Sequence, residues 1–243
     1  MGYSGIFLDR VTAVMRSIDA HPGLDGRLQA AVEHATALVP ACDAAGVVLL
    51  GRRRRIADSA ATSASAAAAD QLQDDLGEGP LLDVAHDVAL ADSNDVASDD
   101  RWPQWAPAAA RHHGFRAVMS TRLDLSDHTS GALTFYSETG TFGDDDRRAA
   151  QLLATHVSTS LDAAKVRETL ERAVEARTTI GQAQGLLMER LDIDADQAIA
   201  LLKRVSQDTN VKLAQIADEV VTSRITPGEP AQVSRAQGRA AQN

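Results

Sequence analysis

The sequence predicts an α+β protein, in which an antiparallel sheet flanked by helices is joined by a long helix to a small all-α domain of three helices. Two segments with alternating apolar residues, 115–125 and 130–138, lie either side of a polar turn, which is typical of paired strands. From Asp144 to about Arg190 there is no proline, and the first glycine is Gly181, which favours one continuous helix. Two short segments with apolar residues at helical spacing follow.

Helices and strands mix in the region before the long helix. The segment 24–40 has leucine and alanine at helical spacing and ends at a proline, which cannot continue a helix. The apolar run 44–50 predicts a central strand, and a turn and a second strand are expected directly after it. A helix over 63–76 is expected to end at Gly77, because glycine tolerates the left-handed backbone that closes many helices.

Four further elements precede or open the long helix. The stretch GEGPLLDVA at 77–85 predicts a glycine-proline turn that leads into a short helix. Residues 87–96 predict a short strand followed by a loop, and 99–114 predict a loop and a helix that ends at Gly114. After the two paired strands, DDD at 144–146 is expected to begin the long helix, since carboxylates favour the N-terminal end of a helix dipole.

Two short helices are predicted after the long one. Asp194 is a suitable N-cap for the first of them, with Gln197 completing a capping box, and Asn210 is the expected N-cap of the second. The apolar residues of that last helix repeat at helical spacing: Leu213, Ile216, Ala217, Val220 and Val221. Helices this short can bury their apolar faces only against one another and the end of the long helix.

We therefore expect four parts along the chain. These are an N-terminal helix over 1–20, an α+β domain over 21–163, a three-helix domain over 164–225 and a disordered polar tail over 226–243.

The long helix carries apolar residues spaced by three and four, an arrangement with two readings. It fits either a coiled coil with a second chain or an amphipathic helix packed within one chain. Arg177 and Gln184 interrupt this seam, whose apolar members are Val166, Leu170, Ala173, Ile180 and Leu187.

Charge and composition narrow the classes of function. The formal net charge of −10 argues against a generally basic nucleic-acid binder, although a local basic face is compatible with it. The single cysteine excludes an intrachain disulfide. No apolar run approaches the roughly 20 residues that span a bilayer, and the amphipathic N-terminus carries Asp9, unlike a signal peptide. These features predict a cytoplasmic protein with no membrane partner.

No catalytic, cofactor or metal site is expected. The chain lacks a nucleophile elbow, a Walker glycine loop and a G-x-G-x-x-G stretch, and its histidines are scattered. Cys42 is predicted to be a small buried residue. Trp102 and Trp105 are expected either to cover a pocket or to anchor their loop. RRRR at 52–55 predicts a turn with solvated arginines rather than a nucleic-acid site.

Two regions resemble known families. Residues 171–224, which contain TTIGQAQGLLMER at 178–190, resemble the ANTAR domain, a three-helix RNA-binding module of bacterial transcription antitermination regulators. Residues 21–163 are similar to the GAF domains that precede ANTAR in actinobacterial proteins. The stretches that carry this second likeness are LGEGPLLDVA at 76–85, 101–123 and 131–156.

The resemblance implies a homodimeric regulator that is not an enzyme. Its GAF domain would sense a signal, for which a small-molecule ligand is one candidate, and its ANTAR domain would bind hairpins in leader transcripts so that a terminator does not form. Two positions depart from the families. Gln184 stands where ANTAR modules usually carry lysine, and Leu81 stands where many GAF relatives carry cysteine.

Basic and amide side chains of the three-helix domain are the candidate RNA contacts. Lys and Arg would pair with phosphates, while amides would donate to and accept from the base edges of an exposed loop. The alternative is a solvated surface with i, i+4 ion pairs. The candidates are Arg177, Gln182, Gln184, Arg190, Lys203, Arg204, Asn210, Lys212 and Arg224.

Two other functions remain open for the three-helix domain. If its apolar surface docks a partner protein, the domain is a protein-interaction module of a ligand sensor and does not bind RNA directly. Binding to DNA is disfavoured, because Asp218 and Glu219 on the last helix suit a major groove poorly.

Gly181 and Gly185 lie one turn apart in the long helix. Glycine in a helix interior costs about 1 kcal/mol relative to alanine, so their presence calls for a reason. We expect them to let another backbone approach, from the second or third helix of the domain or from a dimer mate.

Overall fold

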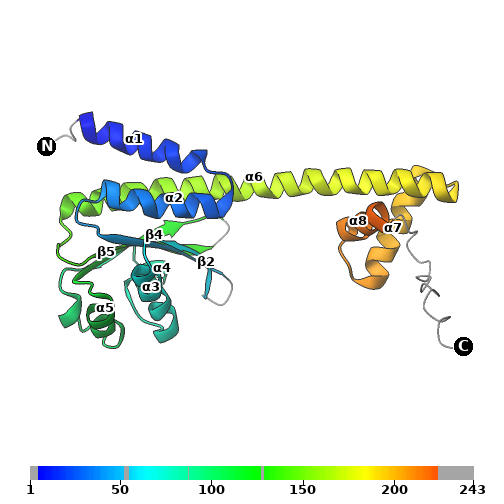
Figure 1. Cartoon of the computed structure of the whole chain (residues 1–243). Coiled ribbons are helices and arrows are strands. Elements are labelled where there is room, and N and C mark those ends of the chain that lie inside the picture. The colour runs from blue at the N-terminus through cyan, green and yellow to red at the C-terminus, as the bar shows by residue number, and fades with distance from the viewer. Residues whose placement is uncertain (1–4, 52–54, 87, 127–128, 224–243) are drawn as a thin grey trace, which may run out of the picture. The chain divides into compact units, whose positions relative to one another are not determined.

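A computed structural model describes residues 5–51, 55–86, 88–126 and 129–223 (Figure 1). The chain divides into two compact units, Met1–Glu168 and Thr169–Asn243. The tail expected at 226–243, Arg224 and most of the RRRR turn lie outside the described residues. Each unit is taken by itself below.

The first unit is built on a five-stranded antiparallel sheet. Its order is β2-β1-β5-β4-β3, so the central strand β5 pairs with both β1 and β4. The α+β class predicted from the sequence is confirmed, as are the two strands either side of the polar turn. The strands are β1 (Ala44–Leu50), β2 (Ile56–Ala61), β3 (Leu90–Ser93), β4 (Ala117–Asp124) and β5 (Ser130–Ser137).

Helices cover both faces of this sheet (Figure 1). One face carries α1 (Gly5–Ala20), α2 (Gly23–Leu38) and the start of α6 (Asp144–Leu191). The other face carries three shorter helices: α3 (Ala64–Leu76), α4 (Pro80–His86) and α5 (Trp105–His113), with a 3-10 turn, η2 (Val96–Ser98), before α5.

Strand β5 shows how the two faces acquire separate cores. Successive side chains of a strand point to opposite faces. Leu133 and Phe135 therefore join the apolar cluster beneath α2 and α6, while Ala132 and Tyr136 join the cluster beneath α3, α4 and α5. Because all four are buried, the central strand is covered on both sides.

Several helix ends follow from single residues. Gly77 and Gly114 adopt left-handed backbone, with φ of 71° and 74°, directly after α3 and α5, as the sequence predicted. Ser63 caps the start of α3 by accepting a hydrogen bond from the backbone N–H of Ala66. Asp144 begins α6, and all three acidic residues lie in its first turn.

The second unit packs three helices around one small core. The end of α6, α7 (Ala195–Thr209) and α8 (Leu213–Ser223) contribute to it. The predicted capping box is confirmed: the Asp194 carboxylate accepts from the Gln197 backbone N–H, and the Gln197 side chain accepts from the Asp194 N–H. The buried residues are Ala183, Leu187, Ala198, Leu202, Ile216, Ala217 and Val220.

The prediction for Asn210 was wrong. Asn210 does not begin the third helix but ends α7 in left-handed backbone, with φ of 55°. Asparagine tolerates this conformation better than most residues, which makes it a substitute for glycine at a helix C-terminus. The third helix begins later, at Leu213, and the carbonyl oxygen of Lys212 accepts its first backbone hydrogen bonds.

Within the described residues, the close approach expected at Gly181 and Gly185 does not occur. A Cβ at either position would meet no described atom within 4 Å beyond the neighbouring backbone of α6. The predicted seam also changes, because Ile180 and Leu187 pack in the core of the second unit. The helix face with the glycines is therefore a different one, open to the outside of this unit.

Candidate functional site

The candidate RNA contacts on α6 differ in the solvent exposure of their side chains. Arg177 and Gln182 are exposed. Gln184 is half-buried, and its Nε2 donates to the backbone carbonyl of Ala195 across 2.7 Å. This hydrogen bond links α6 to the first residue of α7. Arg190 is half-buried in the last turn of α6.

The remaining described candidates lie on α7 and in the turn after it. Lys203 and Arg204 are adjacent and exposed, on the side of α7 away from buried Ala198 and Leu202. Asn210 and Lys212 are exposed where α7 passes into α8. The structure thus divides the candidates among three places: one face or another of α6, the outer face of α7, and the α7–α8 turn.

Any phosphate contact on the second unit depends on a local group of basic side chains rather than on the charge of the whole unit. Between residues 169 and 221 there are six Lys and Arg and nine Asp and Glu, so the unit as a whole is acidic. Phosphate neutralisation depends on basic side chains near the backbone of the nucleic acid. The adjacent pair Lys203 and Arg204 is the most concentrated positive charge among the described residues of this unit.

An apolar line runs along the outside of α6 within the second unit. Leu170 and Val174 are 61% and 66% exposed, and Met188 and Leu191 are 37% and 40% exposed. Gly181 lies on the same line, since positions 174, 181 and 188 repeat every seven residues. Leu170 and Leu191 belong to the second heptad position, which Arg177 and Gln184 interrupt. Exposed large apolar side chains in a heptad register are typical of a surface that packs against another helix.

The first unit buries a polar cluster between α3 and the sheet. The hydroxyl of Tyr136 on β5 donates to Oδ1 of Asp70 on α3 across 2.6 Å. Gln73, one turn further along α3, donates from Nε2 to the Tyr136 oxygen across 3.2 Å and accepts from the Leu81 N–H across 2.8 Å. Asp70 and Gln73 therefore hold α3 to both β5 and the start of α4.

Two glycines leave room for this cluster. A Cβ at Gly46 on β1 would overlap the carboxylate of Asp70, and a Cβ at Gly79 would overlap the side chain of Gln73. Gly79 also has a φ of 139°, which side chains rarely adopt. The backbone is thus shaped to accept these polar groups.

Burial governs the protonation of the cluster. Desolvation raises the pKa of Asp70 to about 7, and the hydrogen bond from Tyr136 offsets only part of that effect. Burial, and then the neighbouring Asp70 charge, raises the pKa of Tyr136 well above its usual value. Asp70 is therefore the member of the cluster that changes charge near neutral pH.

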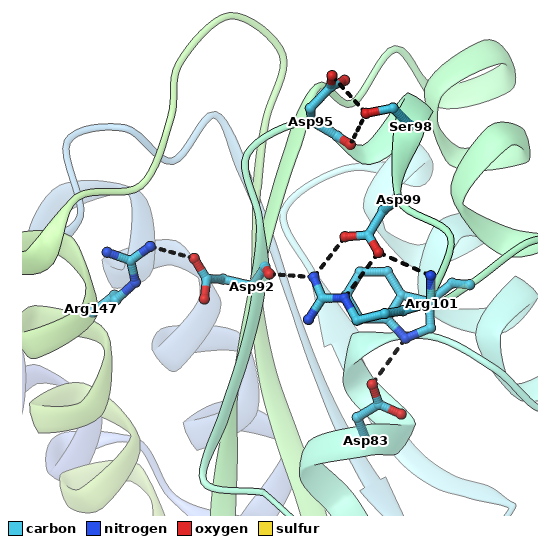
Figure 2. Close-up of polar contacts among 8 residues, drawn as sticks. Asp83, Asp92, Asp95, Ser98, Asp99, Arg101 and Arg147 are labelled. Atoms are coloured by element: carbon cyan, nitrogen blue, oxygen red, sulfur yellow. Dashed lines mark hydrogen bonds and ion pairs between the residues drawn. The ribbon is translucent and has the colours of Figure 1, made fainter.

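A second polar network ties α4 and β3 to α6 (Figure 2). Oδ2 of Asp83 on α4 accepts from the indole N–H of Trp102 across 2.9 Å, and the Arg101 guanidinium stacks on the Trp102 ring. Arg101 also donates to the backbone carbonyl of Asp92 on β3, whose carboxylate pairs with Arg147 on α6 (Figure 2). The contacts form one connected path from α4 to the first turns of α6.

Charge pairing stabilises this path. The Arg101 hydrogen bond lowers the pKa of Asp99 to about 2, so that carboxylate is ionised at neutral pH. The Asp92 hydrogen bond raises the pKa of Arg147. Asn94 adds a backbone link, because its amide both accepts from and donates to Phe142, two residues before α6. The segment that follows β3 is thus held to the start of the long helix.

Trp102 and Trp105 are both fully buried, with their rings edge-to-face at 5.7 Å. The Trp105 indole N–H donates to the Ala69 carbonyl on α3, and the Glu78 carboxylate accepts from the Trp105 backbone N–H. Of the two roles predicted for these rings, anchoring of the loop is the one that these contacts support.

Cys42 is buried, as predicted, and burial raises its pKa to about 12, which suppresses thiolate chemistry. In the described part of the chain, no group of three or more His, Cys, Asp or Glu is arranged to hold a metal ion. None of the described helices combines the length and the hydropathy that a bilayer span requires.

The buried cluster was not predicted from the sequence. Asp70 and Gln73 looked like ordinary polar positions in an alanine-rich helix. Their spacing from Ala66 and Ala69 places them on the buried face of α3, and this helical spacing is the sequence pattern that could have predicted their burial. Tyr136 read as one more residue of an alternating strand.

Comparison with protein families identifies both units. A family model described as the GAF domain matches residues 22–162, and one described as the ANTAR domain matches residues 168–221. No curated protein matches the sequence significantly.

Solved structures with low sequence identity share the fold. The GAF domain of an Acinetobacter phosphoenolpyruvate-protein phosphotransferase is 13% identical, with a TM-score of 0.50 over 69% of this chain and 99% of that one. Escherichia coli SdiA is 18% identical, with a TM-score of 0.50 over 90% of this chain and 99% of that one. Bacteriophytochrome RpBphP3 from R. palustris is 13% identical, with a TM-score of 0.55 over 86% of this chain and 47% of that one.

Proposed function

Because the chain belongs to the GAF domain family and carries a C-terminal ANTAR domain, we propose that it is a transcription antitermination regulator that binds RNA hairpins in nascent transcripts. GAF and ANTAR domains are regulatory rather than catalytic. In this proposal the GAF domain, over 21–163, senses a signal, and the ANTAR domain, over 164–225, binds RNA. Hairpins held by the ANTAR domain keep a terminator from forming.

The match of residues 168–221 to the ANTAR domain carries this proposal. The exposed pair Lys203 and Arg204 on α7 supports it, because two adjacent, exposed basic side chains can both contact phosphate oxygens. Arg177, Gln182, Arg190, Asn210 and Lys212 are the further contacts that we propose. Gln184 would serve both the RNA and the link to Ala195, because an amide has an acceptor oxygen as well as a donor nitrogen.

We further propose that the protein acts as a homodimer through the outer face of α6. The exposed line of Leu170, Val174 and Met188 supplies apolar area, and the open Gly181 and Gly185 allow a second backbone to come close. Two ANTAR domains would then hold two hairpins of one transcript. A small molecule bound to the GAF domain is one signal that would change this arrangement.

Electrophoretic binding of the full chain to a two-hairpin leader RNA tests the RNA proposal. We expect a complex at low salt whose affinity falls as salt rises, because counterions are released from the phosphates. A chain that binds no RNA at low salt, or whose affinity does not depend on salt, would contradict the proposal.

Charge reversal of Lys203→Glu with Arg204→Glu localises the contact. We expect the double variant to weaken RNA binding by at least about tenfold, because two phosphate contacts become repulsive. The matched control is Arg10→Glu with Arg16→Glu, which reverses two exposed charges on α1 and changes the net charge equally. The control should bind RNA nearly as well as the unmodified chain.

The same pair of variants separates the rival function. A protein-interaction module that docks a partner through apolar surface would tolerate the reversal at Lys203 and Arg204. Absence of RNA binding by the unmodified chain and by both double variants would therefore favour the rival, whereas equal RNA binding by both variants would move the RNA contact away from Lys203 and Arg204.

A further inference from the structure

The GAF domain buries a carboxyl group without a basic partner. Within the described residues, no Lys, Arg or His pairs with Asp70, and Arg55 pairs instead with Asp74 (3.0 Å) and Asp75 (3.5 Å) on the same helix. A buried carboxylate without a counter-charge is costly, so such a group favours its neutral, protonated form. An asparagine would fill the same space without this electrostatic cost, so the acid at this position calls for a functional explanation.

Several elements pack around Asp70, and one titratable side chain on them bonds its carboxyl group. Helix α3 packs against β1, β2, α4 and α5, and Tyr136 reaches it from β5. Tyr136 is the titratable group among the described residues that hydrogen-bonds the carboxyl. The other titratable or charged side chains on the surrounding elements are Arg55, Asp58, Asp74, Asp75, Asp83, His86, Arg111, His112 and His113.

We propose that the GAF domain senses protons, and that Asp70 is the group that binds the proton. With the proton bound, the neutral carboxyl keeps α3 packed on the sheet beside Gly46. When the proton is lost, the buried charge loosens α3. The ligand of this site is then the proton itself, and the inference rests on the sensor function proposed above. The buried position of Asp70 and its lack of a basic partner among the described residues carry the proposal, and its raised pKa, about 7, agrees with it.

The site is connected to the output helix by contacts within the first unit. Gln73 joins Tyr136 to the Leu81 N–H at the start of α4. From α4, Asp83 contacts Trp102, Arg101 stacks on Trp102 and donates to Asp92, and Asp92 pairs with Arg147 on α6 (Figure 2). A shift of α3 and α4 therefore acts on the first turns of α6.

Tryptophan fluorescence of the full chain, titrated with pH, tests the proposal. Both tryptophans of the protein lie in the core beneath α3, α4 and α5, and Trp105 donates to Ala69, the residue before Asp70. We expect a single-proton transition centred near pH 7 in the unmodified chain. The transition should be absent in Asp70→Asn and unchanged in Asp75→Asn, an exposed acid on the same helix.

Two further variants exclude other origins of the transition. His113 stacks near Phe115, which in turn stacks on Tyr136, so a histidine is the competing source. His113→Gln should leave the transition unchanged. Tyr136→Phe removes a hydrogen bond that stabilises the charged carboxylate, so the midpoint should move to higher pH. A transition that persists in Asp70→Asn, disappears in His113→Gln, or keeps its midpoint in Tyr136→Phe would overturn the proposal.

RNA binding by the same variants tests whether the proton acts as a signal. We expect the affinity of the unmodified chain for the two-hairpin RNA to differ at least about threefold between about pH 6 and about pH 8, and that of Asp70→Asn to change less. Equal pH dependence in the two chains would overturn the sensing role. If neither chain binds RNA at any pH, the RNA proposal fails, while the fluorescence titration still decides whether Asp70 is the proton site.

Discussion

At the level of single residues, the most consequential side chains of the first unit are polar ones in apolar surroundings. Asp70 and Gln73 lie on the buried face of α3 and are satisfied by one tyrosine hydroxyl and one backbone N–H. Buried polar groups stabilise a fold only while every partner is present. The cluster therefore makes the packing of α3 conditional on the charge of Asp70.

Replacing Asp70 with asparagine should stabilise the first unit at neutral pH. The pKa of Asp70 is raised from 3.8 to about 7, so the folded state holds its proton more tightly than the unfolded state does. Its contribution to stability is fully present below pH 3.8 and is lost as pH rises through 7. The gain in unfolding free energy for Asp70→Asn should grow across that range, towards a plateau on the order of 4 kcal/mol.

Urea unfolding followed by tryptophan fluorescence measures this difference, because both tryptophans lie in the first unit. When the unfolding free energy of the variant is subtracted from that of the unmodified chain, the pH dependence of the carboxylates that both chains share cancels. Asp75→Asn is the control, and its difference from the unmodified chain should not depend on pH. A pH-independent difference for Asp70→Asn would mean that its carboxyl is not buried as a neutral acid.

At the level of elements, short helices depend on their ends. The core of the second unit is small, so the hydrogen bonds at the start of α7 are a sizeable part of its stability. Asp194 and Gln197 satisfy two backbone N–H groups that would otherwise lack partners. At the other end, Asn210 in left-handed backbone closes the same helix.

Asp194→Ala should destabilise the second unit by about 1 kcal/mol, because it removes the side chain that caps α7. Asp196→Ala is the matched control: it removes a carboxylate near the same helix end, and with it a favourable interaction with the helix dipole, but no capping hydrogen bond. Thermal unfolding of the two variants, followed by circular dichroism, should separate them. Equal losses would assign the effect of Asp194 to its charge rather than to its hydrogen bond.

At the level of the whole molecule, the outer face of α6 in the second unit leaves apolar area uncovered by the described chain. Leu170 and Val174 are more than half exposed, and Gly181 offers no side chain. A helix that is apolar on one face because of packing within the chain would have buried these residues. Their exposure is the reason to expect a second copy.

Leu170→Glu with Val174→Glu should convert the dimer to monomers. Two carboxylates buried against their own symmetry mates lose hydration and repel, which should weaken association by at least about a hundredfold. Sedimentation velocity over a range of concentrations measures this. Glu175→Arg, an exposed position of α6 outside the heptad positions of the apolar line, is the control and should leave the dimer intact. A monomeric unmodified chain would end the dimer proposal.

The order and type of the elements could be read from the sequence, because they depend on local backbone chemistry. Proline, glycine and the two-residue alternation set the ends of α2, α3 and α5 and the paired strands β4 and β5. The same local signals carried the family resemblance over both units. Asn210 shows the limit of such reading: an asparagine between two helices serves equally well as the end of one or the start of the next.

What the sequence determined by itself was thus the class of fold, the sequence of helices and strands and the two families. Only the tertiary structure decided which polar residues are buried and which small residues are open. Asp70 became a buried acid because Gly46 and Tyr136, far away in the chain, lie opposite it across the α3–sheet contact. Gly181 and Gly185 proved open because α7 and α8 pack on another face of α6. Burial depends on which distant segments meet, and no local pattern carries that information.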